Sequence, residues 1–217
     1  MSGTFKREIT SGDLERMSIP KRYWNVTFEG ISGGPHLEKI VSYVKKLDEM
    51  RAEGAGLLLW GDNGVGKTGI AVVIAKEYRR RGNTVYFLEY AGLRDSVIRN
   101  EMFDSSVTCL ERAKTVDVLV LDDVGKGRED TRAYLERLFD EIIRVRNSRK
   151  LVTIMTTNMD PYAGGKTGED GVIGSQLGDK LKKSTMHSFK ECIFPVFVDG
   201  ADYRDLAASR LSAILVS

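Results

Sequence analysis

The segment LLLWGDNGVGKT, residues 57–68, joins a short apolar run to the pattern GxxxxGK[ST]. The run 57–60 has the length and composition of a buried strand, and apolar residues at helical spacing follow the motif. Glycines at positions 61, 64 and 66 let the backbone curve tightly, so that successive N–H groups can point at phosphate oxygens. Strand, loop and helix in this order predict a phosphate-binding P-loop and a bound nucleoside triphosphate.

The residues of this loop have different roles in binding the triphosphate. Lys67 places a positive charge near the β- and γ-phosphates, and the Thr68 hydroxyl is positioned to bind Mg²⁺. The helix that begins here directs its positive end at the same phosphates. A glycine-rich turn formed by chance does not explain why strand, motif and helix coincide. The predicted nucleotide-binding residues are Gly61, Asp62, Asn63, Gly64, Val65, Gly66, Lys67, Thr68 and Gly69.

A second apolar run, VLVL at 118–121, ends in two acids, Asp122 and Asp123. A buried strand that delivers carboxylates at its carboxyl end is the Walker B arrangement. We expect Asp122 to hold Mg²⁺ and Asp123 to act as the general base that activates water. Many ATPases have a glutamate at the position of Asp123. The aspartate is one methylene shorter, which favours slow hydrolysis. The alternative is that the two acids only cap the following turn.

Polar residues also end the next predicted strand, which covers 151–156. Asn158 follows it, and an amide at this place would reach the γ-phosphate or the attacking water, the position called sensor 1. Alone, Thr-Thr-Asn is a common strand ending. The sequence Asn158-Met159-Asp160 lacks the lysine of the guanine-reading motif NKxD, so ATP is the predicted nucleotide.

Length and composition fit one soluble α/β domain. The chain has 217 residues, and 33 basic against 31 acidic residues give a net charge of +2, so any nucleic-acid surface must be local. No apolar run approaches the length of a membrane span, and the polar N-terminus lacks a signal-peptide core. We therefore expect a cytoplasmic protein without membrane contact. The polar residues 1–18 are expected to be a flexible arm, and 19–217 the ATPase domain.

Strands alternate with helices along the rest of the chain, which predicts a three-layer α/β fold around a parallel sheet. Pro195 indicates that the last strand either lies at an edge of that sheet or opens at this residue. The aromatic segment that includes Tyr23 and Trp24 either covers the core or packs near the nucleotide base. Further strands are predicted over 85–88 and 193–198, and helices over 35–51 and 131–146.

The order of these motifs resembles the AAA+ family, and within it the DnaC/IstB-type group of helicase-loader and transposition-helper ATPases. The resemblance implies an AAA+ core with five parallel strands in the order 5-1-4-3-2, without a separate C-terminal lid. It also implies that Arg204 is a catalytic second sensor. The matching pieces are IPKRYW at 19–24, the P-loop strand and motif at 57–68, LDDVG at 121–125, TTN at 156–158, LGDKL at 177–181 and DYR at 202–204.

The same resemblance implies partners. The chain is expected to assemble into oligomers, in which a basic finger of one subunit completes its neighbour's site. The other expected partners are single-stranded DNA and a ring-shaped replicative helicase, or else a transposase. The finger is Lys180, Lys182, Lys183 or a nearby arginine, because lysines stand where the family usually has arginines. Candidate DNA contacts are Lys126, Arg128 and Arg132.

Four functions remain open at this stage. The first is an ATPase that loads a replicative helicase onto single-stranded DNA, and the second is a transposition helper that binds duplex DNA. The third is a small-molecule kinase on the same P-loop, which would need an acceptor pocket and an arginine-bearing lid. The fourth is a nucleotide-gated binding module with little hydrolysis.

Overall fold

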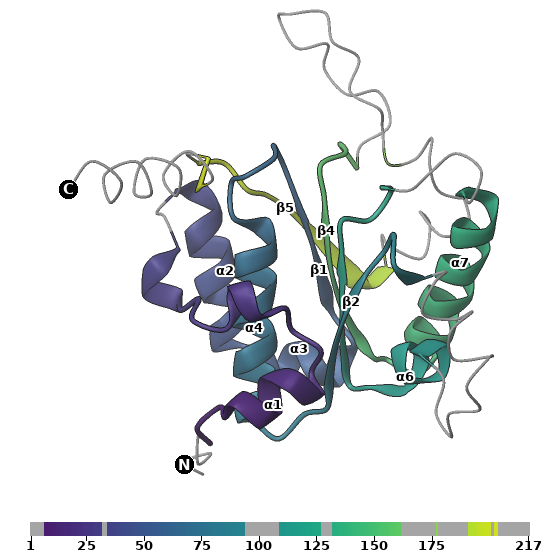
Figure 1. Cartoon of the computed structure of the whole chain (residues 1–217), viewed down its shortest axis with the longest axis horizontal. Coiled ribbons are helices and arrows are strands. Elements are labelled where there is room, and N and C mark those ends of the chain that lie inside the picture. Colours follow the sequence, from purple (N-terminus) through teal and green to yellow (C-terminus); the bar gives the residue numbers. More distant parts are fainter. Residues whose placement is uncertain are drawn as a thin grey trace, which may run out of the picture.

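A parallel sheet of five strands separates two layers of helices (Figure 1). The computed structural model describes residues 7–31, 34–93, 109–126, 132–161, 177, 191–200 and 202–203. The strand order is β2-β3-β4-β1-β5, which confirms the order implied by the resemblance. The strands are β1 Gly56–Trp60, β2 Val85–Glu89, β3 Val118–Asp122, β4 Val152–Thr157 and β5 Ile193–Phe197.

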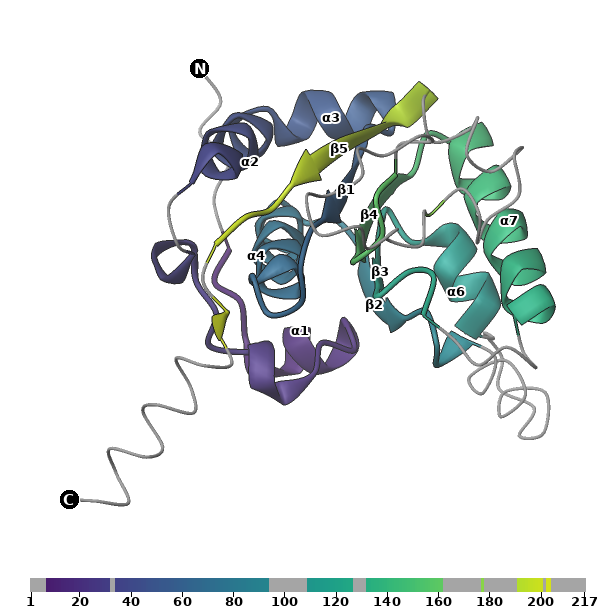
Figure 2. The same ribbon diagram turned by 90° about the horizontal axis from the view of Figure 1, so that it is seen from above.

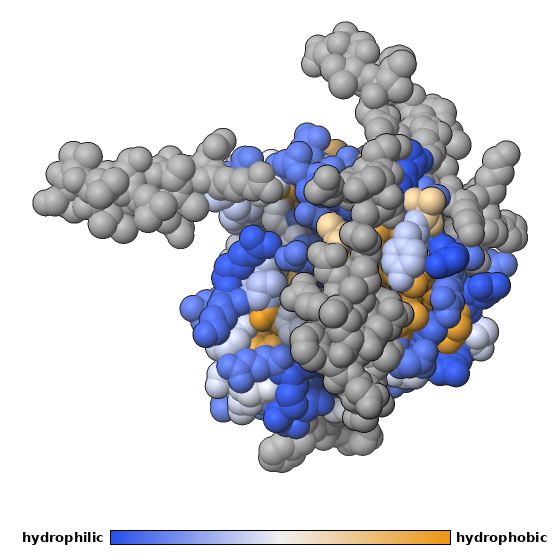
Figure 3. Space-filling model, turned by 45° about the vertical axis from the view of Figure 1, so that its right-hand side comes forward, coloured by the Kyte–Doolittle hydropathy of each residue, from blue (hydrophilic) through white to orange (hydrophobic). Residues whose placement is uncertain are grey.

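Both faces of the sheet are covered, which is why its central strands consist of nearly continuous apolar residues. Alternate residues of β1 serve opposite faces: Leu57 and Leu59 pack toward α4, and Leu58 packs toward α7. Figure 2 shows α2, α3 and α4 on one side of the strands and α6 and α7 on the other. Outside the grey residues, the face in Figure 3 is mostly hydrophilic. The helices are α1 Ser11–Arg16, α2 Pro35–Lys45, α3 Leu47–Glu53, α4 Lys67–Arg80, α6 Cys109–Thr115 and α7 Arg132–Ser148, with 3₁₀ turns η1 Lys21–Tyr23 and η2 Phe28–Gly30.

The helix predicted over 35–51 is two helices, because the chain leaves helical geometry at Lys46, where φ is −110° and ψ is 23°. Gly54 then ends α3 in the left-handed region, with φ of 68°. A Cβ at this position would lie 2.6 Å from the backbone of Lys150, so glycine is needed both for the turn and for the close approach of the two segments.

Residues 7–18 are not a flexible arm, so the predicted boundary at residue 18 is wrong for them. Helix α1 begins with a capping box, in which Thr10 and Asp13 exchange hydrogen bonds between side chain and backbone. Leu14 and Met17 are buried in the core beneath α4. The Met17 carbonyl accepts a 2.8 Å hydrogen bond from the Phe87 N–H, so this segment also lies along the outer side of β2.

A buried arginine ties the α7 layer to the sheet. Arg146 is fully buried, and its guanidinium donates to the Thr153 hydroxyl at 2.9 Å and to the Val152 carbonyl at 2.6 Å. It also donates to the carbonyls of Ala113 and Val116 at the end of α6, at 2.8 and 2.9 Å. Burial lowers the pKa of Arg146 to about 9, which leaves the side chain charged at neutral pH.

No helix in the described part of the chain is long and apolar enough to cross a membrane.

Candidate nucleotide site

The P-loop connects β1 to the first turn of α4, as the motif predicts. Gly61, Gly64 and Gly66 all have positive φ, at 144°, 82° and 92°. Gly66 immediately precedes α4, whose first residue is Lys67. The loop therefore turns back on itself directly in front of a helix N-terminus, the arrangement that binds phosphate groups.

A cavity of about 560 Å³ opens beside this loop, at the carboxyl ends of β1, β3 and β4. Parallel α/β sheets commonly bind ligands at the carboxyl ends of their strands, and the volume of this cavity suits a nucleotide. Seven of the predicted nucleotide-binding or metal residues line it, together with Asp123 and Asn158. The lining residues are Arg22, Tyr23, Asn63, Gly64, Gly66, Lys67, Thr68, Gly69, Asp122, Asp123, Asn158 and Tyr203.

The two predicted magnesium ligands meet in this cavity. The Thr68 hydroxyl donates to Asp122 Oδ1 at 2.8 Å, and the Thr156 hydroxyl donates to the same oxygen at 2.6 Å. Burial raises the pKa of the Asp122 carboxyl, although both hydroxyls favour its charged form. A hydroxyl and a carboxylate oxygen brought together at the phosphate loop are the ligand types that Mg²⁺ takes, so the residues present fit the ion.

Asp123 stands beside Asp122 in an unusual backbone conformation, with φ of 58°. Its N–H donates to the Thr156 hydroxyl at 2.9 Å, so Thr156 contacts both acids. Its carboxylate pairs with Lys126, with 2.9 Å between Oδ2 and Nζ, and both side chains are partly exposed. Motif reading did not single out Thr156, because its role depends on how β3 and β4 lie against each other.

Lys67 and Asn158 both contact the P-loop itself. Lys67 is almost completely buried, and its ammonium donates to the carbonyls of Gly61 at 2.9 Å and Asp62 at 2.5 Å. Burial lowers the pKa of Lys67, while the nearby Asp123 carboxylate opposes that shift. The Asn158 amide donates to Asn63 Oδ1 at 2.6 Å, which places the predicted sensor directly against the loop.

A segment near the end of the sequence lies on the same loop. The Tyr203 N–H donates to the Gly64 carbonyl at 3.0 Å, and its hydroxyl donates to the Gly30 carbonyl at 3.4 Å. A Cβ on Gly64 would come within 1.9 Å of the Asp202 carboxylate, and one on Gly66 within 2.9 Å of the Tyr203 ring. The segment thus lies directly against these two glycines, whose positive φ values already favour glycine.

Several predicted residues lie outside the described part of the chain: Arg204, Lys180, Lys182, Lys183 and Arg128. The two remaining candidates for DNA contact form ion pairs within the chain. Lys126 pairs with Asp123, and Arg132 donates to Glu136 at 2.8 Å.

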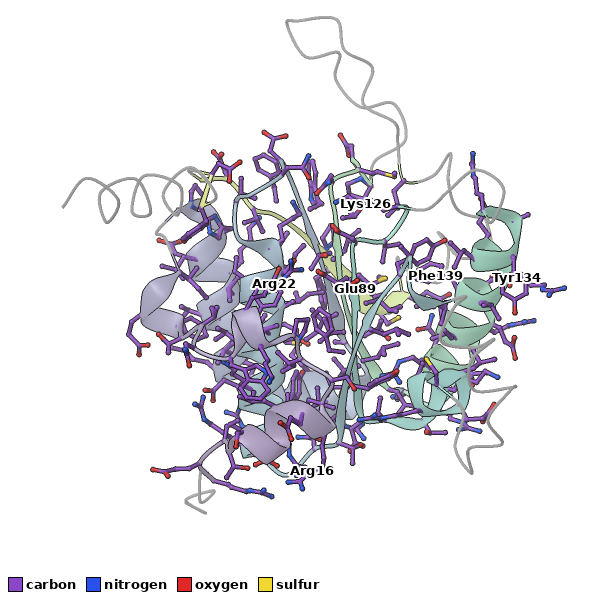
Figure 4. The ribbon with its side chains drawn as sticks, viewed as in Figure 1. Arg16, Arg22, Glu89, Lys126, Tyr134 and Phe139 are labelled. Carbon is purple, nitrogen blue, oxygen red and sulfur yellow. The ribbon has the colours of Figure 1, made fainter. Side chains whose placement is uncertain are left out.

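The aromatic segment before the P-loop covers the core, as one of the two alternatives predicted, and it also reaches the cavity. Tyr23 lines the cavity, and Trp24 packs on the core while its indole N–H donates to the Ile19 carbonyl at 2.8 Å. Arg22 also lines the cavity, with its guanidinium 4.7 Å from the centre of the Tyr23 ring. Figure 4 shows Arg22 beside Glu89, whose carboxylate lies 3.9 Å from the guanidinium.

Comparison with known families shows to which family of P-loop proteins the chain belongs. Residues 30–189 match the family described as IstB-like ATP binding protein. The chain belongs to this family. It is an AAA+ protein of the DnaC/IstB type, as its motifs and sheet order indicated.

Individual relatives agree with that placement. The chain is 27% identical over 173 residues to the replicative helicase loader DnaI of Bacillus subtilis (strain 168), an alignment that covers 77% of this chain and 53% of the relative. The chain thus spans about half the length of that protein. A crystal structure of the DnaC helicase loader superposes with a TM-score of 0.65 at 25% identity, covering 83% of this chain and all of the other.

A more distant structure shares only the fold. It is the replication initiator DnaA bound to AMPPCP and single-stranded DNA, with a TM-score of 0.62 at 17% identity. That likeness covers 82% of this chain and 51% of the other.

Proposed function

We propose that this protein binds and hydrolyses ATP, assembles on single-stranded DNA and delivers a ring-shaped replicative helicase. The observation that carries the ATPase part is the meeting of Thr68, Asp122, Asp123 and Asn158 around one cavity beside the P-loop. The helicase and the DNA are proposed from the similarity to helicase loaders.

In this proposal the chain's own groups position and neutralise the triphosphate. Lys67 and the loop N–H groups bind the phosphates, and Thr68 and Asp122 would hold Mg²⁺, which supplies further positive charge when bound. Asp123 accepts a proton from the attacking water, and Asn158 orients that water. Arg204 acts as the second sensor.

One observation favours a second candidate, the nucleotide-gated module with little hydrolysis. The carboxylate proposed to accept the water's proton is already ion-paired with Lys126 at 2.9 Å. This pair must open or rearrange before Asp123 can act as a base, so basal turnover is expected to be slow. A DNA strand or a neighbouring subunit that draws Lys126 away would accelerate the reaction.

Steady-state phosphate release, measured with and without single-stranded DNA, tests the proposal. We expect slow basal release that single-stranded DNA stimulates, and loss of release with retained ATP binding in Asp123→Asn. Tight ATP binding without turnover under every condition would instead support the passive module. Stimulation by duplex DNA alone would support the transposition helper, and phosphate transfer to a metabolite would contradict all the ATPase assignments.

The helicase part needs its own measurement. Mixing the protein with a replicative helicase hexamer and ATP, then determining the mass of the complex in solution, should show a defined assembly. Lys67→Ala, which is expected to lose nucleotide binding, serves as the control for ATP dependence. If the helicase binds neither the wild-type protein nor Lys67→Ala, the loader assignment is contradicted and the ATPase assignment is unaffected.

A further inference from the structure

Residues 23–26, here called the strap, cross α4 between two cavities. Tyr23 lines the nucleotide cavity, whereas Trp24 and Val26 line a second cavity of about 270 Å³. The Val26 side chain lies 3.5 Å from where a Cβ of Gly69 would be, and Gly69 itself lines the nucleotide cavity. The strap therefore lies between the two spaces, and through Tyr23 it forms part of the wall of the nucleotide cavity.

Lys76 fastens the strap to α4. Its side chain is almost completely buried, and its ammonium donates to the carbonyls of Tyr23 at 3.2 Å, Trp24 at 2.8 Å and Val26 at 2.8 Å. A lysine ammonium has three N–H donors, so the strap uses all of them. A charge buried in this way is stable only while such partners are present, which makes the geometry specific.

The strap's other hydrogen bonds are local. The N–H groups of Tyr23, Trp24 and Val26 donate to carbonyls within residues 20–23, and the Trp24 indole donates to Ile19. These bonds shape the segment. Among the described residues, the hydrogen bonds that join the strap to α4 are the three from Lys76, which add to the packing of Tyr23 and Trp24 on the core.

The helix that carries Lys76 also carries the P-loop lysine. Lys67 is the first residue of α4, and Lys76 follows nine residues later, about 14 Å along the helix axis. Because a helix is stiff over this length, the strap keeps a constant position relative to the phosphate loop. An aromatic ring held at a set place beside a phosphate loop can pack against a nucleotide base.

We propose that Lys76 is a positioning residue, which holds Tyr23 as the wall against the base end of ATP while Lys67 holds the phosphate end. The inference rests on the proposed nucleotide-binding function and adds to it the part of the ligand that the strap recognises. Lys76 does not contact the nucleotide. It acts through the strap.

Comparing Mg²⁺-ATP with Mg²⁺-tripolyphosphate, which has no base or ribose, tests this role by calorimetry. In Lys76→Met we expect the affinity for ATP to fall about tenfold, because three carbonyls lose their donor and the strap shifts. The affinity for tripolyphosphate should change less than about twofold, because the phosphate loop is intact. Lys45→Met, which removes an exposed lysine of α2, should change neither value.

Two further variants keep the test decisive. Lys76→Gln, which retains two N–H donors, should change the ratio of the two affinities in the same direction but less. Tyr23→Ala should lose ATP affinity selectively, and adding it to Lys76→Met should cause little further loss, because both changes remove one wall.

An equal loss of both ligands, or an unchanged ratio in Lys76→Met, would overturn the inference and leave the proposed function standing. Wild-type protein that binds neither ligand would overturn the proposed function, and the inference with it.

Discussion

Among single residues, Thr156 is notable because its hydroxyl makes hydrogen bonds with both acids of the site. Its hydroxyl donates to Asp122 Oδ1 and accepts from the Asp123 N–H, so one side chain orients the predicted metal ligand and the predicted base together. A hydroxyl has one donor and two acceptor sites, so a single threonine side chain can make both contacts.

We therefore expect Thr156→Val, a substitution of nearly equal shape, to lower kcat about tenfold or more, in the range found for groups that orient catalytic or metal-binding residues. Thr156→Ser keeps the hydroxyl and should retain most of the activity. Both variants should be compared by steady-state phosphate release at saturating ATP. Equal activity of the valine and serine variants would show that the hydroxyl has no such role.

Asp122→Asn should separate stability from function. Burial raises the pKa of Asp122, so the charged carboxylate costs stability at neutral pH, and this cost disappears as the pH falls through the raised pKa toward the ordinary 3.8. Without nucleotide, the variant should melt higher than wild type near pH 7, and the gain should shrink in acid. Thermal unfolding from pH 4 to 8 checks this. A variant that melts lower than wild type at pH 7 would contradict it.

The sequence predicted this site unevenly, and the reason is physical. Lys67, Thr68 and Asp122 could be identified because phosphate and magnesium chemistry restricts residue type and spacing within a short segment. Thr156 and Lys76 could not, because their contacts join segments that are distant in sequence. Such contacts exist only once the strands are in register or the strap lies on α4.

Among the elements, α1 shows how a polar segment becomes part of a core. Asp13 is completely buried at its centre and accepts hydrogen bonds from Arg79 on α4 at 2.9 and 3.1 Å. Burial alone would raise the pKa of Asp13, but the bonds from Arg79 and Thr10 outweigh it and hold the pKa well below its usual value. The Asp13 carboxylate therefore links this short helix to α4, in addition to the buried side chains of Leu14 and Met17.

Asp13→Ala should lower the free energy of unfolding by about 2–3 kcal/mol, because Arg79 and the helix N-terminus lose their acceptor. Since the pKa is lowered in the folded state, the stabilisation is present above pH 3.8 and is lost progressively below it. Urea unfolding at pH 7 and pH 3 measures both effects. Glu15→Ala, an exposed acid of the same helix, should have little effect.

Helix α1 also explains why the prediction of a flexible arm was wrong for residues 7–18. A helix of six residues is too short to show a clear apolar period, so its polar composition suggested disorder. The informative signal was the pair Thr10 and Asp13 at capping-box spacing, followed by Leu14 and Met17. By contrast, the apolar runs of β1, β2, β3 and β4 were predictable because these strands are buried on both faces.

At the level of the whole molecule, charge limits how DNA can bind. The net charge is only +2, so attraction must come from local cations, and Lys126 and Arg132 are already paired with acids. Any DNA contact by these residues has to exchange an internal ion pair for a phosphate.

We expect stimulation by single-stranded DNA to weaken steeply as salt rises from 50 to 200 mM, with a slope of about 0.7 per phosphate contact when affinity and salt are both logarithmic. Lys126→Met should reduce that slope by roughly one contact, about 0.7, if the residue meets DNA. Titrations of DNA-stimulated phosphate release at several salt concentrations measure this. Lys45→Met is the control, and an unchanged slope in Lys126→Met would exclude Lys126 from the DNA surface.

The sheet order was predictable only through the resemblance, since periodicity identifies strands but not their neighbours. For β5, Pro195 indicated either an edge position or an opening of the strand, and the structure has the edge position. The Val198 N–H donates to the Trp60 carbonyl at 2.8 Å, and alternate residues of a strand point their N–H groups the same way. Pro195, which has no N–H, therefore turns its nitrogen away from β1, where no ladder bond is lost.

That proline and the Met17–Phe87 bond lie at opposite margins of the described sheet, and they have a joint consequence. One margin is missing a donor, and the other has a donor already engaged by the α1 segment. Neither offers a continuous template on which a second molecule could add its own strand. Concentrated protein without ligand should accordingly resist fibril formation, and subunits that do associate are not expected to do so by adding strands at these two margins.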